Sequence, residues 1–209
     1  MQKTAYLYVC DTLSDWETGY LTAELNTNRF SKKGADEFKV KTVAISEAPI
    51  RTMGGITIVP DMTIKDISSA GAGVLILPGG ETWLEPQQTG ILNIAKEFLS
   101  NNILVVAICG ATMGLAKAGC LEERAHTSNN LAYLKSVCPN YTGESFYKEE
   151  PAVIDNCLIT ASGTAPLQFA YLAIKHLGIY SEATLDAWYN LHLTHEDKYF
   201  YALMKSMEE

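Results

Sequence analysis

The chain has 209 residues, of which 47% are apolar, so it is long and apolar enough for one α/β domain with a substantial core, and disorder is excluded. Lys and Arg total 16 against 24 Asp and Glu, and the resulting net charge of −8 excludes nucleic acid and anionic membrane as expected partners. The longest uninterrupted apolar run, residues 103–109, is far shorter than the roughly 20 residues of a membrane-spanning helix.

The cysteines, the N-terminal stretch and the glycines indicate the compartment of the protein and whether it needs a cofactor. The five cysteines are widely spaced and form no C-x-x-C pair, which argues against a disulfide framework and a zinc site, so no metal is expected. The N-terminal apolar stretch ends at Asp11 and is too short for a signal-peptide core. Gly71-Ala72-Gly73 precedes a strand instead of following one, so no nucleotide or flavin fingerprint is present. We therefore predict a soluble cytoplasmic protein without a cofactor.

Strand patterns alternate with helical patterns through the first half of the chain. The predicted strands are residues 4–9, 38–45, 73–77 and 103–108, and the predicted helices are 16–30 and 88–99. The last two strands are almost continuously apolar, which is typical of parallel strands covered by helices on both faces. Gly54-Gly55 beside the alternating run 53–59 predicts a short hairpin at a sheet edge.

The second half of the chain continues this pattern and ends in an aromatic helical segment. A helix is predicted at 130–137, and strands at 141–147 and 153–160 are expected to pair antiparallel, with a fold-back at Asp155-Asn156 as the alternative for the second. A last domain helix at 165–177 ends at Gly178. We predict one domain at 1–180 and a helical extension of it at 181–209, whose aromatic residues pack on the domain, form an oligomer interface or cover the site.

Cys109 stands where an apolar strand turns abruptly into a helix of small residues. The small neighbours Gly110, Ala111 and Gly114 let the backbone bend sharply and present the sulfur in a crevice, as in a nucleophile elbow. The unpaired N–H groups at the helix start favour negative charge, so we expect the thiol pKa to be lowered from about 8.5. The alternative is a buried structural cysteine before a tight helix start.

A second candidate element, Pro78-Gly79-Gly80, directly follows the strand at 73–77. The carboxyl ends of parallel strands meet at one crevice, so this turn is expected near Cys109. Glycine lets a backbone N–H approach a substrate oxygen closely. The N–H groups of Gly80 and Gly110 would form an oxyanion hole, although Pro-Gly-Gly could also be a simple turn.

The third element is Asp15-Trp16-Glu17, which follows the first strand. A carboxylate and a thiolate in contact repel each other, so Glu17 and Cys109 should share one proton, with Glu17 donating to the sulfur. Asp15 and Trp16 are further candidates for the pocket. The alternative for the two acids is that they complement the dipole of the following helix.

These motifs, in this order and spacing, resemble the ThiJ/PfpI superfamily of the class I glutamine amidotransferase-like fold. The matching segments are residues 9–18, 75–80, 107–110 and 124–129. The resemblance covers residues 4–178 and implies a flavodoxin-like, three-layer α/β/α sandwich with a mostly parallel sheet, usually dimeric. It implies Cys109 as nucleophile, Glu17 as its hydrogen-bonding partner, and Gly80 with Gly110 as oxyanion donors. Its members include intracellular cysteine peptidases, deglycases of the Park type, glyoxalases, isocyanide hydratases and redox-responsive chaperones, and the shared fold does not choose among them.

One departure from the family pattern concerns the general base. Family members often have Thr-Thr-His or Thr-Ser-Tyr after the elbow helix, whereas this chain has Thr127-Ser128-Asn129. Asn129 can orient a substrate or a water, but it cannot accept and return a proton at neutral pH. His126 is expected to face the opposite way on an extended strand and to be an ordinary histidine. The missing histidine favours small aldehyde-type substrates over peptide bonds.

Three hypotheses for function follow. The first is a cysteine-nucleophile hydrolase of the peptidase or amidase class acting on a small-molecule or peptide substrate, or a glyoxalase or deglycase acting on small aldehydes or their adducts. The second is a redox sensor in which peroxide oxidises Cys109, with Cys10 as a candidate resolving thiol. The third is a chaperone-like module without turnover that uses the aromatic C-terminal extension as its contact surface. A homodimer is expected for each.

Overall fold

The computed structural model describes residues 1–207. Its strands are β1 Gln2–Tyr8, β2 Glu37–Ala44, β3 Ile50–Arg51, β4 Thr57–Ile58, β5 Met62–Thr63, β6 Ala72–Leu77, β7 Leu104–Ile108, β8 Ala152–Asp155 and β9 Leu158–Ala161. Its α-helices are α1 Gly19–Thr27, α2 Thr89–Ser100, α3 Gly110–Lys117, α4 Leu131–Val137, α5 Pro166–Leu177, α6 Glu182–Thr194 and α7 Asp197–Ser206. Short 3-10 helices are η1 Ile64–Asp66, η2 Pro86–Gln88 and η3 Gly143–Phe146.

A seven-stranded sheet in the order β5-β2-β1-β6-β7-β9-β8 forms the centre of the molecule. All neighbouring strands in it are parallel except the β8–β9 pair. The sheet extends in both directions from β1, since β2 pairs with one of its edges and β6 with the other. In such a sheet the crevice opens outside the carboxyl ends of the strands, where β7 leads into α3.

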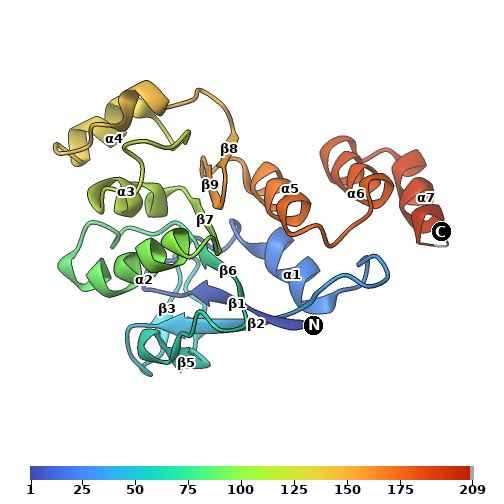
Figure 1. The fold of residues 1–209 in the computed structure, drawn as a ribbon, viewed down its shortest axis with the longest axis horizontal. Helices are drawn as coiled ribbons and strands as arrows, with labels where there is room; N and C mark the ends of the chain where they lie inside the picture. The colour runs from blue at the N-terminus through green and yellow to red at the C-terminus, as the bar shows by residue number, and fades with distance from the viewer. Residues whose placement is uncertain (208–209) are drawn as a thin grey trace.

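The central strands bury both of their faces, which explains their continuous apolar runs. In β6, Leu75 and Leu77 belong to one core cluster, and the alternate residues Val74 and Ile76 belong to the other. This alternation follows from the two-residue period of a strand. Helices α2 and α3 cover the first face, and α1, α5 and α6 cover the second. The helices flank the sheet in Figure 1, which confirms the predicted three-layer α/β/α sandwich with a mostly parallel sheet.

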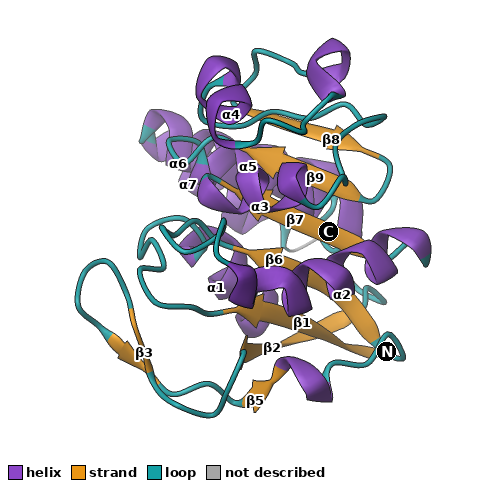
Figure 2. Ribbon diagram, turned by 90° about the vertical axis from the view of Figure 1, so that its left-hand side faces the viewer, coloured by secondary structure: helices purple, strands orange, loops and turns teal. Residues whose placement is uncertain are grey.

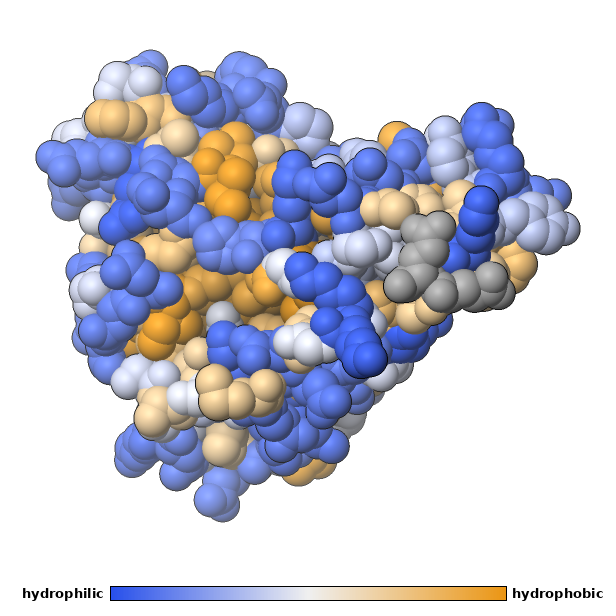
Figure 3. All heavy atoms as spheres, turned by 45° about the vertical axis from the view of Figure 1, so that its right-hand side comes forward, coloured by the Kyte–Doolittle hydropathy of each residue, from blue (hydrophilic) through white to orange (hydrophobic). Residues whose placement is uncertain are grey.

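The C-terminal extension consists of two helices, α6 and α7, that form an arm beside the body of the molecule (Figure 1). Trp188 of α6 and Leu203 of α7 are buried in the same core cluster as α1 and α5. By contrast, Phe200 and Tyr201 of α7 are exposed. Figure 3 shows apolar side chains gathered in the middle of one face, surrounded by hydrophilic ones, with the arm beside them. The extension therefore packs on the domain through one side of each helix.

Two predicted elements end differently in the structure. The helix predicted from Trp16 begins only at Gly19, because residues 10–18 form a loop along the crevice. It ends early, because Asn28 adopts a left-handed conformation (φ 52°) and its side chain pairs with the backbone of Phe38. The predicted hairpin forms with Gly55 at a positive φ of 84°, but β3 and β4 make a separate two-stranded sheet that projects from the body (Figure 2).

The strand predicted at 141–147 is wrong. This segment contains η3, and its one ladder contact is a parallel bridge between Tyr147 and His126. Tyr141 and Tyr147 instead pack edge-on against the buried His126 ring. The alternative for 153–160 is confirmed, since the chain folds back at Asp155-Asn156 and pairs β8 with β9. Within residues 1–207, no helix combines the length and apolar character that crossing a bilayer demands.

Candidate active site

Cys109 occupies the junction between β7 and α3 in a backbone conformation that is rare for a non-glycine residue, with φ 58° and ψ −123°. Its N–H donates to Ala161 O at 2.9 Å, which ties the turn to the neighbouring strand β9. Such a conformation costs about 1–3 kcal/mol and persists where the surrounding structure enforces it. The turn leaves the Cys109 side chain partly exposed, whereas the other four cysteines are buried. The structure thus has the geometry of a nucleophile elbow.

Glu17 is fully buried beside this turn. Its Oε2 accepts a hydrogen bond from the N–H of Gly79 at 2.5 Å. A Cβ atom added at Gly79 would lie 2.6 Å from Oε2 and 2.8 Å from the Cys109 Cβ, and one added at Gly163 would lie 2.8 Å from the Cys109 Sγ and 3.1 Å from the Glu17 Oε1. Two glycines therefore enclose the carboxyl and the sulfur together, and only glycine fits at either position.

The pKa of Glu17 supports one shared proton. Burial raises the pKa of this carboxyl above its ordinary value, although contacts with Gly79, Cys109 and Ser14 act in the opposite direction. Among residues 1–207, no hydrogen-bond partner pairs with its Oε1, the oxygen on the side of the sulfur. A protonated Oε1 can donate to a thiolate, whereas an ionised carboxylate repels it.

The pKa of Cys109 results from opposing influences. Burial raises the pKa of the thiol, and a charged Glu17 raises it further, whereas the Asn129 amide and the Gly110 N–H lower it. The helix start thus acts in the predicted direction, but burial opposes it and is the larger influence. The predicted lowering of the Cys109 pKa is therefore wrong, because partial burial, which no sequence pattern indicates, raises the pKa by more than the helix start lowers it.

Asn129 contacts the sulfur directly. Its Nδ2 donates to the Cys109 Sγ at 3.2 Å, and its Oδ1 accepts from the Gly163 N–H at 2.8 Å. The amide therefore supplies a hydrogen-bond donor to the sulfur without any capacity to exchange a proton. Gly163 was not among the predicted site residues. Its position directly after β9, next to β7 in the sheet, is the signal that could have found it.

Gly80 and Gly110 lie against each other at the crevice. A Cβ atom added at Gly110 would lie 2.4 Å from the Gly80 carbonyl oxygen and 3.1 Å from its nitrogen. The backbone N–H groups of Gly80 and Gly110 make no hydrogen bond to another backbone group within residues 1–207. Two such donors beside a nucleophile can stabilise an oxyanion.

Asp15 and Trp16 lie in the loop before α1 and make different contacts. The Asp15 Oδ2 accepts from the Gly54 N–H at 2.6 Å and so holds the β3–β4 hairpin beside this loop. Trp16 is half exposed, yet its Nε1 donates to the Gly163 carbonyl at 3.0 Å. Asp15 thus binds the β3–β4 hairpin, whereas Trp16 binds Gly163, which lies against Cys109.

The remaining polar candidates lie apart from the sulfur. His126 is fully buried, with Nδ1 2.6 Å from the Arg124 carbonyl oxygen and Nε2 2.6 Å from the Tyr141 hydroxyl. Burial lowers the pKa of its imidazole, which suits a neutral structural histidine. Cys10 is buried behind Gly80, and burial raises the pKa of its thiol to about 11, so it is a poor resolving thiol.

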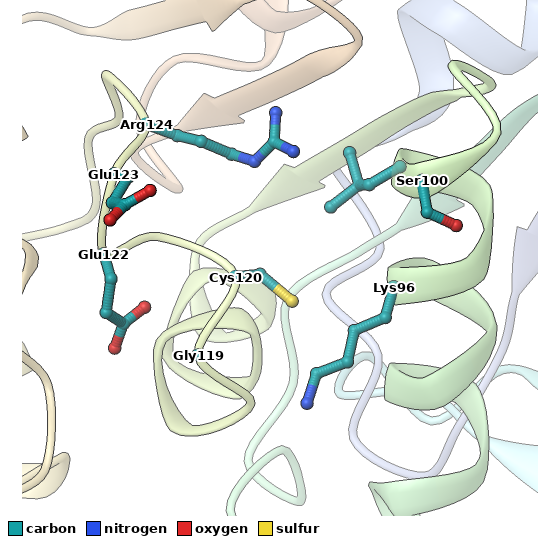
Figure 4. Close-up of a pocket in the computed structure, with 8 residues that line it drawn as sticks. Lys96, Ser100, Gly119, Cys120, Glu122, Glu123 and Arg124 are labelled. Carbon is teal, nitrogen blue, oxygen red and sulfur yellow. The ribbon is translucent and has the colours of Figure 1, made fainter.

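A separate pocket of about 460 Å³ lies on the side of the sheet where the parallel strands begin, away from the crevice at their carboxyl ends. It is lined by the end of α2 and the loop after α3, which run back toward the amino ends of the strands. Figure 4 shows Lys96 and Ser100 on α2 facing Cys120 and Arg124 across the gap. The Cys120 thiol is buried, and burial raises its pKa to about 11, so this pocket lacks an activated nucleophile.

Comparison with known proteins places the whole chain in one group. The DJ-1/PfpI family matches residues 3–176. The protein named "Uncharacterized protease YoaZ" of Bacillus subtilis (strain 168) is 46% identical over 205 residues, which are 98% of each chain. A crystal structure of a thiJ/pfpI family protein from Bacillus anthracis is 48% identical, covers 100% of this chain and 99% of its own, and has a TM-score of 0.96.

A more distant relative shows the same fold. The DJ-1 superfamily protein Atu0886 from Agrobacterium tumefaciens is 28% identical, with a TM-score of 0.77 over 91% of this chain and 99% of its own. The family match ends at residue 176, so it includes the elbow, Glu17 and Asn129 but leaves out α6 and α7. On the sequence match, the elbow geometry and the agreement of the folds, this chain belongs to the DJ-1/PfpI family.

Proposed function

We propose that this protein is a cysteine-nucleophile hydrolase in which Cys109 attacks the carbonyl carbon of a small acyl or peptide substrate. The observation that carries the proposal is the partly exposed Cys109 on a strained elbow, with Glu17 and Asn129 at its sulfur. The name of the Bacillus subtilis relative, "Uncharacterized protease YoaZ", supports the hydrolase class. The five free cysteines support a reducing compartment such as the cytoplasm.

The proposed reaction begins with a thiolate on Cys109 and a proton on Glu17. The sulfur forms a bond to the carbonyl carbon, and the N–H groups of Gly80 and Gly110 stabilise the resulting oxyanion. When the intermediate collapses, the bond to the leaving nitrogen breaks, and that nitrogen takes the proton from Glu17. A water molecule then attacks the thioester carbonyl and gives one proton to the Glu17 carboxylate. The C–S bond breaks, which releases the carboxylic acid and restores the Cys109 thiolate. A carboxyl with a raised pKa is suited to both transfers.

A second candidate is addition of Cys109 to a small aldehyde or its adduct, as in glyoxalases and deglycases. The observation that favours it is that Asn129 contacts the sulfur and, within residues 1–207, no histidine hydrogen-bonds to it. Addition to an aldehyde needs no protonation of a leaving amine, so a single carboxyl acid is sufficient for the first step. The two candidates share the same nucleophile and the same oxyanion donors.

Turnover by purified wild-type protein and by Cys109→Ala tests the proposal with fluorogenic peptides, aryl amides and methylglyoxal as substrates. We expect wild type to turn over at least one substrate class and Cys109→Ala to lose about 1000-fold or more in kcat/KM. Cys120→Ala is the matched control, because it removes a buried thiol near the amino ends of the strands, away from the crevice. Equal turnover by wild type and Cys109→Ala, or no turnover by either, contradicts the proposal.

A further inference from the structure

Three hydrogen bonds connect an exposed aromatic residue to the candidate nucleophile. The Trp16 Nε1 donates to the Gly163 carbonyl at 3.0 Å, the Gly163 N–H donates to the Asn129 Oδ1 at 2.8 Å, and the Asn129 Nδ2 donates to the Cys109 Sγ at 3.2 Å. The four residues come from four separate segments: the loop before α1, the loop after β9, the loop before α4 and the elbow. Distant parts of the chain thus meet at one sulfur atom.

The direction of these bonds fixes the orientation of the Asn129 amide. The Gly163 N–H can donate only to the oxygen of the Asn129 amide. This bond turns the NH₂ group of the amide toward Cys109. A flipped amide would place NH₂ against N–H and a carbonyl oxygen against the sulfur. Asn129 therefore presents a donor to Cys109, and a donor favours the thiolate over the thiol.

Trp16 hydrogen-bonds to the carbonyl of Gly163, whereas Asn129 hydrogen-bonds to its N–H. The indole is 53% exposed, so burial of its ring is not what keeps it in place. Gly163 itself is pressed against the site, since a Cβ atom there would lie 2.8 Å from the Cys109 Sγ. A small displacement of this segment therefore moves the Asn129 anchor relative to the sulfur.

We propose that Asn129 is a fixed hydrogen-bond donor that stabilises the Cys109 thiolate, and that Trp16 is a positioning residue that acts on Asn129 through Gly163. The proposal rests on the proposed function only in taking Cys109 as the nucleophile. It describes the state of the sulfur before any substrate binds, so it can be measured without turnover.

The pH dependence of Cys109 alkylation by iodoacetamide, followed site by site with mass spectrometry, tests this proposal. We expect Asn129→Ala to raise the midpoint of the alkylation profile by about one pH unit, because the thiolate loses a donor. Trp16→Phe keeps an aromatic side chain but removes the indole N–H, so it should shift the midpoint in the same direction by a smaller amount. Because both residues act through one path, the double variant should match Asn129→Ala alone.

Tyr133→Phe is the matched control, because Tyr133 is also 53% exposed and lies in α4, just beyond Asn129. It should leave the midpoint unchanged. A wild-type midpoint in Asn129→Ala overturns the role of Asn129, and a wild-type midpoint in Trp16→Phe, or additive shifts in the double variant, overturns the role of Trp16. If the midpoints shift as expected while no protein turns over a substrate, the proposed function fails and this inference stands.

Discussion

At the scale of single residues, the candidate site places a fully buried carboxyl, Glu17, beside a partly exposed thiol, Cys109. Glu17 is fully enclosed, and its Oε2 is fixed by the Gly79 N–H, which leaves Oε1 on the side of Cys109. Placing a carboxyl and a thiol together in a low-dielectric crevice makes two negative charges costly. We therefore expect the pair to carry at most one negative charge near neutral pH, and the position of the remaining proton to decide whether the sulfur is nucleophilic.

Replacing Glu17 with glutamine should separate stability from reactivity. The folded-state pKa of Glu17 is raised, so its contribution to stability is present below the ordinary value near 4.5 and is lost as pH rises through the folded-state value. The free energy of unfolding of Glu17→Gln should therefore equal or exceed that of wild type at pH 8, by roughly 1 kcal/mol, and the difference should shrink or reverse at pH 5. Urea unfolding at the two pH values measures this.

The same variant should show lower turnover, because glutamine cannot give a proton to the leaving nitrogen or take one from the attacking water. Glu47→Gln, which changes an exposed carboxyl, serves as the control and should follow wild type at both pH values. A Glu17→Gln protein that loses more stability at pH 8 than at pH 5 would show that the buried carboxyl is ionised and structurally required.

The residues of the site were predictable to different degrees. Cys109 and Glu17 were identified because strand ends in a parallel sheet converge at one edge, and the structure brings them together. The bond from Trp16 to Gly163 spans 147 positions of the chain, so no local pattern indicates it. No sequence pattern indicates how far Glu17 and Cys109 are removed from solvent, and this removal raises the pKa of both groups.

At the scale of elements, the elbow depends on two backbones in close contact. The β7–α3 turn and the loop after β6 approach so tightly that a Cβ atom at Gly110 would lie 2.4 Å from the Gly80 carbonyl oxygen. This distance is far below van der Waals contact, so the two loops can keep their positions only if residue 110 is glycine. The requirement explains why a residue with poor helix propensity begins α3.

Gly110→Ala should therefore move the Gly80 loop and damage the proposed oxyanion donors. We expect kcat/KM to fall by about 100-fold, as for loss of one such donor, with a loss of roughly 1–3 kcal/mol in stability. Gly19→Ala is the matched control, because Gly19 also begins a helix, α1, and a Cβ atom there meets nothing within 4 Å. If Gly110→Ala retained full activity, the two loops would not form the oxyanion site.

The elements that were predicted wrongly share a physical cause. Residues 141–147 have the aromatic and β-branched composition of a strand, but β8 occupies the edge of the sheet at that end. The two tyrosines of this segment instead surround the buried His126 ring, so tertiary packing determined the local structure. The helix predicted from Trp16 starts late for a similar reason, because residues 15–17 take part in contacts across the crevice.

At the scale of the whole molecule, one buried carboxylate joins α1 to the C-terminal helices. Glu24 of α1 accepts hydrogen bonds from the Tyr180 hydroxyl at 2.7 Å and from the Trp188 Nε1 at 3.1 Å, and it also pairs with Arg29. Burial alone would raise the pKa of Glu24, but these partners outweigh it and hold the pKa below its ordinary value. The arm formed by α6 and α7 is thus fastened to the body by both polar and apolar contacts.

Glu24→Gln should destabilise the molecule at neutral pH. We expect a loss of about 1–3 kcal/mol at pH 7, because the partners of the carboxylate are left incompletely satisfied. The folded-state pKa is lowered, so the contribution of Glu24 is present above pH 4.5 and is lost as pH falls through the folded-state value. Thermal unfolding of the variant should therefore approach that of wild type at low pH.

The exposed Glu97 of α2 provides a control, and Glu97→Gln should unfold as wild type does at every pH. Equal stability of Glu24→Gln and wild type at pH 7 would show that the apolar contacts of Trp188 suffice to hold the arm. The composition and periodicity of the chain predicted that these helices exist, but the buried Glu24 network joins residues up to 164 positions apart and required the structure.

The measurement that tests this account most directly is the rate of alkylation of each of the five cysteines in the native protein. Cys109 is a partly exposed thiol beside the buried Glu17 carboxyl, whereas Cys10, Cys120, Cys138 and Cys157 are at most 7% exposed. We predict that iodoacetamide modifies Cys109 first, at least about ten-fold faster than any other cysteine. Slower or equal modification of Cys109 would contradict the claim that the fold presents this sulfur as a nucleophile.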